Sequence, residues 1–78
     1  MTKENFDEAL QTLISRQPYL PFTVELNGGT RFEVDFPNAI VFRDGVACFV
    51  APGGHLKLFD HESVNLIHTP SVSLSESP

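Results

Sequence analysis

The side chains best suited to catalysis or metal binding stand together near the end of the chain, in the run Asp60-His61-Glu62-Ser63. A carboxylate, an imidazole and a hydroxyl can form a nucleophilic relay, and histidine with carboxylates can hold a metal ion. Either site needs side chains that converge, whereas neighbours in an extended strand point to opposite faces. The chain contains no His-x-His or His-Glu-x-x-His spacing. We therefore expect no catalytic triad, no metal site and no cofactor.

Cys48 is the only cysteine, and it stands in the apolar run Val46 to Ala51. A nucleophilic cysteine needs an electropositive, partly exposed setting, so this run predicts a buried structural thiol instead. The glycine pairs at 28–29 and 53–54 join strand to strand, whereas phosphate-binding loops join a strand to a helix. We expect a protein that is not an enzyme. A lone cysteine and a polar N-terminus without an apolar leader predict a cytoplasmic location.

The chain is acidic, with ten carboxylates against five lysines and arginines, and its net charge is −5. The five cations are scattered singly, which disfavours nucleic acid and anionic membrane surfaces as partners. The longest apolar run is far too short to span a bilayer. A chain of 78 residues makes one domain near the lower size limit for a single core. Since no disulfide or metal is available to stabilise it, we expect a homo-oligomer.

The first segment predicts an amphipathic helix that starts after Thr2, a suitable N-cap, and stops by about Gln17, before Pro18. Its apolar residues form a single stripe, which consists of Phe6, Ala9, Leu10, Leu13 and Ile14. We expect this stripe to cover the protein's own core. A helix that binds a partner is the alternative.

Alternating residues from Pro21 to Phe36 predict an antiparallel hairpin. The expected register places Leu26 opposite Phe32, with 28–30 as a three-residue loop. It also places Glu25 opposite Glu33. That pair could act as an acid and a base or hold a cation, but we expect a solvated acidic sheet face.

Asp44-Gly45 predicts a two-residue type I′ turn that pairs Val41 with Cys48. Both faces of this hairpin are apolar, yet a small sheet has one core face. We therefore expect the second face, with Ile40, Phe42 and Phe49, to lie under the helix or, alternatively, in an interface between chains. The next strand, 55–60, places Leu56 and Leu58 opposite Val50 and Cys48, and 64–68 forms a short last strand.

These elements predict an α+β fold that is mainly β, with an N-terminal helix followed by a small five-stranded antiparallel barrel of Sm-like or SH3-like type. Pro37-Asn38 marks a bend or a break after the second strand. We assign residues 1–69 to this single domain and residues 70–78 to a flexible tail rich in serine and proline.

The element order resembles that of the Sm-like fold, which includes the bacterial Sm-like RNA chaperone. Residues 24–28 are similar to the first strand and turn of that family, and residues 58–67 resemble its junction of the fourth and fifth strands. The resemblance implies a ring with Phe59, Asp60 and His61 near a central pore. Asp60 stands where the family has a phosphate-contacting lysine, a charge reversal that disfavours RNA. The chain also resembles small uncharacterised bacterial proteins that share a Phe-Asp-Glu-Ala-Leu helix and a Pro-Phe-x-Val-Glu-Leu strand, which implies no activity.

The sequence does not determine the function. The leading hypothesis is a non-catalytic, homo-oligomeric interaction module that binds a protein or a small ligand, because the surface is acidic and no catalytic constellation is present. The alternative is an Sm-like ring that binds RNA by stacking on Phe59 and His61.

Overall fold

The computed structural model describes residues 1–69 and comprises, in this part of the chain, one α-helix, one short 3-10 helix and six strands. The helices are α1 (Lys3–Ser15) and η1 (Pro37–Ala39). The strands are β1 (Phe22–Leu26), β2 (Arg31–Val34), β3 (Ile40–Arg43), β4 (Val46–Ala51), β5 (His55–Asp60) and β6 (Val64–His68). The tail predicted at residues 70–78 lies outside the described residues.

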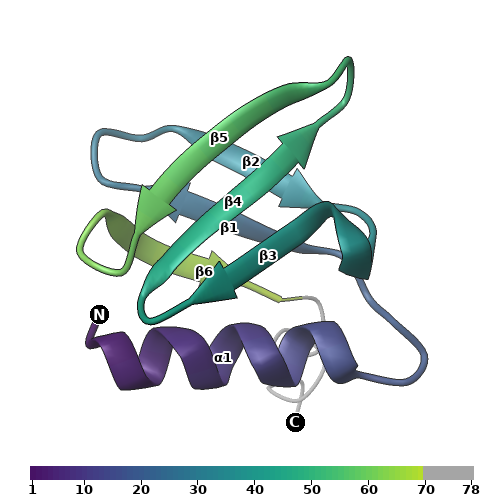
Figure 1. Cartoon of the computed structure of the whole chain (residues 1–78), viewed down its shortest axis with the longest axis horizontal. Helices are drawn as coiled ribbons and strands as arrows, with labels where there is room; N and C mark the ends of the chain where they lie inside the picture. Colours follow the sequence, from purple (N-terminus) through teal and green to yellow (C-terminus); the bar gives the residue numbers. More distant parts are fainter. Residues whose placement is uncertain (70–78) are drawn as a thin grey trace, which may run out of the picture.

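The strands form two three-stranded antiparallel sheets, in the orders β2-β1-β6 and β3-β4-β5 (Figure 1). The predicted α+β class, mainly β, is confirmed. The predicted closed five-stranded barrel is wrong, because Pro37 begins a 3-10 turn that separates β2 from β3. Proline cannot donate to a strand ladder, so the segment passes from one sheet to the other here instead of bending as one strand.

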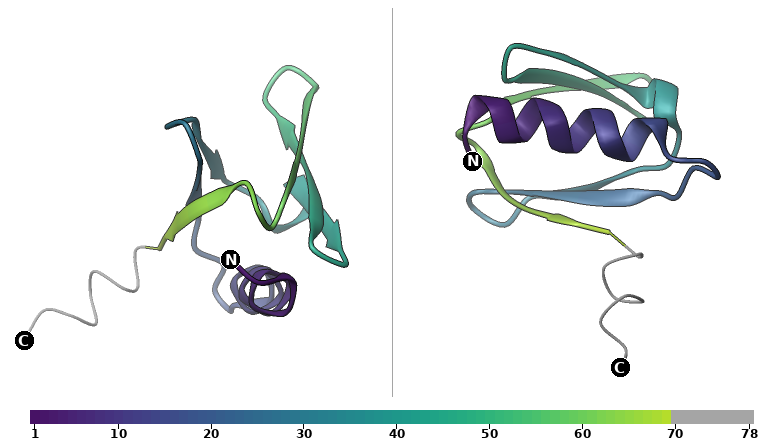
Figure 2. Two further views of the ribbon diagram at one scale, coloured as in Figure 1. Left: turned by 90° about the vertical axis from the view of Figure 1, so that its left-hand side faces the viewer. Right: turned by 90° about the horizontal axis from the view of Figure 1, so that it is seen from below.

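The helix closes one side of this two-sheet arrangement. Figure 2 shows α1 end-on and from below, lying across the side of the molecule where β3 and β6 are the edge strands. Its apolar stripe faces inward, and Phe6, Leu10 and Leu13 are buried. The prediction that this stripe covers the protein's own core is confirmed. Thr2 caps the helix as predicted, because its hydroxyl accepts a hydrogen bond from the Asn5 amide at 3.1 Å.

Aromatic rings join the two sheets and the helix into one core. Phe32 of β2 stacks on Phe49 of β4, with ring centroids 4.8 Å apart. Phe59 of β5 packs edge-on against Phe32 at 5.2 Å and against Phe6 of α1 at 5.9 Å. Edge-to-face and offset stacked pairs of this kind add to the stabilisation from burying the rings.

The hairpins of the β3-β4-β5 sheet have the predicted registers. Val41 pairs with Cys48, and Leu58 pairs with Cys48 from the other side. Asp44 and Gly45 both have positive φ, at 54° and 81°, as a type I′ turn requires.

The predicted register of the first hairpin is wrong by two residues. Val24, not Leu26, pairs with Phe32, and Glu25 pairs with Arg31 instead of Glu33. The Leu26 amide donates to the Thr30 carbonyl at 2.7 Å, which makes residues 27–29 the loop. A shift by two leaves every side chain on its own face, so the alternation of apolar residues is the same in both registers.

Candidate functional site

One face of the β3-β4-β5 sheet is apolar and open to solvent. Successive strand residues alternate between faces, and the residues that point away from the core here are Val41, Val46, Cys48, Val50, Leu56 and Leu58. We call this set the apolar face. Val41 and Leu56 are each 65% exposed, and Leu58 is 75% exposed. Single exposed apolar residues are ordinary, whereas a contiguous group on one sheet face is typical of an interaction site.

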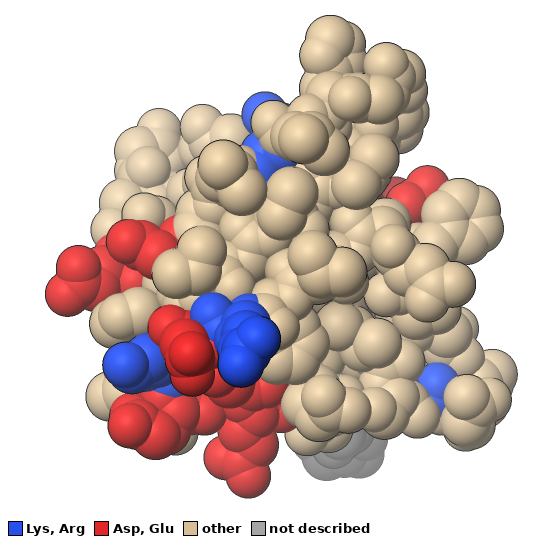
Figure 3. Space-filling model, in the orientation of Figure 1, with Lys and Arg blue, Asp and Glu red and all other residues tan. Residues whose placement is uncertain are grey.

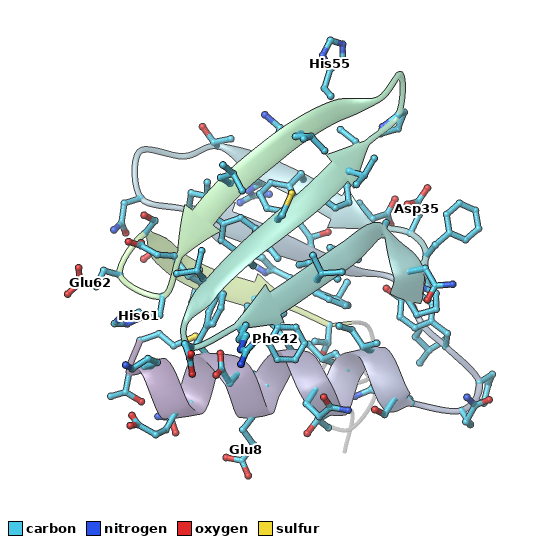
Figure 4. All side chains as sticks on the ribbon, viewed as in Figure 1. Glu8, Asp35, Phe42, His55, His61 and Glu62 are labelled. Carbon is cyan, nitrogen blue, oxygen red and sulfur yellow. The ribbon has the colours of Figure 1, made fainter. Side chains whose placement is uncertain are left out.

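The inward face of the same strands is the one that the sequence assigned to a covering helix or to an interface. Ile40 and Phe49 are 3% and 1% exposed, so both lie in the protein's own core. Phe42 is half-buried, packs against that core and lies beside α1 (Figure 4). Ile40, Phe42 and Phe49 are therefore covered within the chain itself. The face that remains open is the opposite one, which the sequence predicts to be the core face.

Side-chain bulk could have revealed which face is which. The inward positions carry the aromatic rings of Phe42, Phe49 and Phe59, whereas the apolar residues at the outward positions are valines, leucines and a cysteine. Three phenylalanines fill more core volume than the side chains opposite to them. The alternation of apolar and polar residues does not take side-chain size into account, so it does not distinguish the two faces.

The apolar face is arranged in rows across the three strands. Val41, Cys48 and Leu58 form the central row, and Arg43, Val46 and Asp60 form the row at one end. Cys48 stands in the middle of the central strand. It is partly exposed rather than buried as predicted, because it points outward from β4. A shallow hollow of about 270 Å³ lies beside it, with Val41, Val46 and Leu58 in its wall.

Charged side chains are gathered at one end of this face. Figure 3 views the molecule from the side of the β3-β4-β5 sheet, and charge is concentrated in the region of the β3–β4 turn and the start of α1. Most of the surface in this view carries no charged side chain.

The three residues predicted near a pore occupy different environments. Phe59 is 6% exposed and belongs to the core, where its ring contacts Phe6 and Phe32. Asp60 Oδ1 accepts hydrogen bonds from the Ser63 amide at 3.0 Å and the Ser63 hydroxyl at 2.7 Å. These bonds, the hydroxyl first, lower the pKa of Asp60 and fix the β5–β6 turn.

His61 contacts the backbone rather than its acidic neighbours. Its amide donates to the Gly45 carbonyl at 2.7 Å, and its Nδ1 lies 2.9 Å from the Met1 carbonyl oxygen. His55 lies at the opposite end of β5 from His61 (Figure 4). Over residues 1–69, no group of three or more His, Cys, Asp or Glu side chains is placed to hold a metal ion.

A polar cluster that the sequence did not predict lies on the outer face of the other sheet. Glu25 Oε1 accepts from Arg31 Nε at 3.1 Å and lies 3.2 Å from His68 Nε2, and Oε2 accepts from Asn65 Nδ2 at 2.9 Å. The Asn65 hydrogen bond first, and then that of His68, lower the pKa of Glu25. Both carboxylate oxygens are satisfied by neighbouring strands, so the cluster joins β2, β1 and β6.

A groove of about 550 Å³ runs between α1 and β6, with Leu13 and Ile67 among its lining residues. Thr69 also contributes to its wall. Within the described part of the chain, no helix is long and apolar enough to cross a membrane.

Comparison of the chain with known protein families, curated proteins and solved structures gives no match. The Sm-like resemblance therefore stays a prediction from sequence.

Proposed function

We propose that the protein is a non-catalytic interaction module and that it binds a partner protein through the apolar face. The observation that carries this proposal is the continuous set of exposed apolar side chains on three paired strands. Burying apolar surface is favourable by roughly 25 cal/mol per Å². A sheet face that leaves such surface in water gains this free energy when a second surface covers it.

The hydrogen bonds of the carboxylates of Asp60 and Glu25 support a non-catalytic role. Asp60 is bonded to Ser63, and Glu25 is bonded to Asn65 and Arg31. Each carboxylate thus holds a turn or a sheet together. A general base needs a free lone pair within reach of a substrate proton, and Asp60 Oδ1 and both oxygens of Glu25 already bind protein groups.

The shape and charge of the face favour a protein over the other partners considered. Small-molecule sites are concave and bury most of the ligand, whereas the hollow beside Cys48 is shallow and lies on an open sheet. A net charge of −5 repels the phosphate backbone of RNA. An apolar sheet face is suited to a partner with an equally apolar surface.

The test compares three immobilised proteins: the wild type, Leu58→Glu and Leu66→Glu. Leu66 is a matched control, because it is a half-exposed leucine on the other sheet. Extract proteins and the free chain are applied in turn to each. We expect at least one protein to be retained by the wild type and by Leu66→Glu, and its retention to fall at least tenfold on Leu58→Glu. Equal retention by all three proteins, or none by any, would contradict the proposal.

A further inference from the structure

We infer that the partner of the apolar face is a second copy of this chain, packed face to face about a twofold axis that runs along β4. This inference rests on the proposed function and names its partner. Two sheets that pack face to face bury their apolar side chains between them, with their strands roughly aligned. A contact in which both copies use the same face closes on itself, so it produces a dimer rather than a ring.

The rows of the sheet make this arrangement self-complementary. Rotation about an axis along β4 places β4 over the partner's β4, and β3 over the partner's β5. In the central row, Val41 then faces the partner's Leu58, and Cys48 faces the partner's Cys48. Val46 faces Val46 of the partner chain, and Val50 faces Val50 of the partner chain. The apolar side chains of one face thus meet apolar side chains of the other.

The charged row selects this axis over the other in-plane choice. Arg43 and Asp60 stand at the same end of the face, on its two edge strands. The rotation along β4 brings Arg43 over the partner's Asp60, so two opposite-charge pairs form at that end. An axis across the strands would instead place Asp60 over the partner's Leu56, at the uncharged end of β5. Burying a charge against an apolar side chain carries a desolvation penalty, which the first arrangement avoids.

The acidity of the chain also restricts how two copies can meet. Each copy has a net charge of −5, and two such surfaces repel each other at most orientations. The Asp60 carboxylate is held by Ser63 and its pKa is lowered, so it is ionised and able to pair with Arg43. The apolar face therefore offers two copies a contact in which the charges at its end attract.

The experiment uses Cys48 as a reporter, since it is the only cysteine and it stands at the centre of the contact. Packed sheets lie about 10 Å apart, so a bismaleimide with a short spacer is used to join the two thiols. We expect light scattering to give twice the mass of the chain, and the bismaleimide to link most chains in pairs. Dilution to the monomer should raise the alkylation rate of Cys48 at least fivefold.

Two variants test the geometry. Arg43→Glu should weaken the dimer at least tenfold, because it places a carboxylate over the partner's Asp60. Lys57→Glu is the matched control: it makes the same charge change on β5, but Lys57 pairs with Phe49 and shares the other face of the sheet. It should leave the dimer unchanged. Circular dichroism checks that each variant is folded.

The outcomes separate this inference from the proposed function. A dimer that is insensitive to both Leu58→Glu and Arg43→Glu would overturn the geometry inferred here. A monomer at all concentrations would overturn the second copy as partner. If that monomer still retains another protein and loses it on Leu58→Glu, the proposed function stands. If it retains nothing, both fail.

Discussion

The backbone amide of Gly45 donates a hydrogen bond of 2.9 Å to Oδ1 of Asp7, which joins the β3–β4 turn to helix α1. The Gly45 carbonyl accepts from the His61 amide at 2.7 Å, so the same residue also binds the β5–β6 turn. Three segments that are distant in sequence therefore meet at one buried glycine. This junction fixes the position of the helix against the sheet.

Replacing Asp7 with alanine should destabilise the fold by about 1–3 kcal/mol, because the Gly45 amide loses its acceptor in a partly buried site. Urea unfolding followed by circular dichroism measures this difference. Glu8→Ala is the control, since Glu8 is exposed and points away from the sheets (Figure 4). An equal loss in both variants would show that the effect arises from helix charge and not from the tie to Gly45.

Replacing Gly45 with alanine should cost about 2–3 kcal/mol in the free energy of unfolding, through strain at positive φ and a steric clash. A Cβ at Gly45 would lie 2.7 Å from His61 Cδ2 and 2.7 Å from Lys3 Cγ. Gly54→Ala separates the two causes. Gly54 has nearly the same φ, at 84°, but open space around it, so its substitution should cost about 1 kcal/mol. Thermal unfolding measures the stability of both variants. An equal loss of stability in the two would contradict the close packing at Gly45.

Substitution of Phe59 by alanine should lower the free energy of unfolding by about 3–5 kcal/mol, because its ring fills the core between α1 and β2. Phe36→Ala provides the comparison, since that ring is 65% exposed and its removal should change stability by less than about 0.5 kcal/mol. Chemical denaturation gives both values. A small loss for Phe59→Ala would be inconsistent with its place in the core.

The Glu25 cluster predicts how stability changes in acid. The hydrogen bonds from Asn65 and His68 lower the pKa of Glu25 below its ordinary value of 4.5, so the folded protein binds this proton less readily than the unfolded chain. The resulting stabilisation is present above pH 4.5 and is lost as the pH falls through the lower folded pKa.

The free energy of unfolding of Glu25→Gln should therefore fall less steeply below pH 4.5 than that of the wild type. Urea titrations at several acidic pH values measure the slope. Glu33→Gln removes a carboxylate from the neighbouring strand, where it pairs with Thr23, and leaves the cluster intact. If the slope of Glu25→Gln matched that of the wild type, the cluster would not contribute to acid unfolding.

Local signals in the sequence were sufficient for most of the secondary structure. Thr2 and Pro18 bracket the helix because a capping hydroxyl and a proline act within one turn of the backbone. Asp44-Gly45 specified its hairpin, and with it the pairing of Val41 and Cys48, because positive φ at both positions favours one turn type. Alternation placed Val24 and Phe32 on the core face correctly.

Contacts between distant segments decided what these signals left open. Glu25 pairs with Arg31 rather than Glu33, because with a loop at residues 27–29 the Leu26 amide donates to the Thr30 carbonyl. The alternation of apolar residues is the same in both registers, so it does not distinguish them. Phe32, which belongs to the other sheet, stacks on Phe49 and so determines which face of the β3–β4 hairpin is buried. The sequence by itself determined which residues share a face of each strand, because alternation is a local property of the backbone. Only the tertiary structure decided which face is covered, because burial depends on what packs against it.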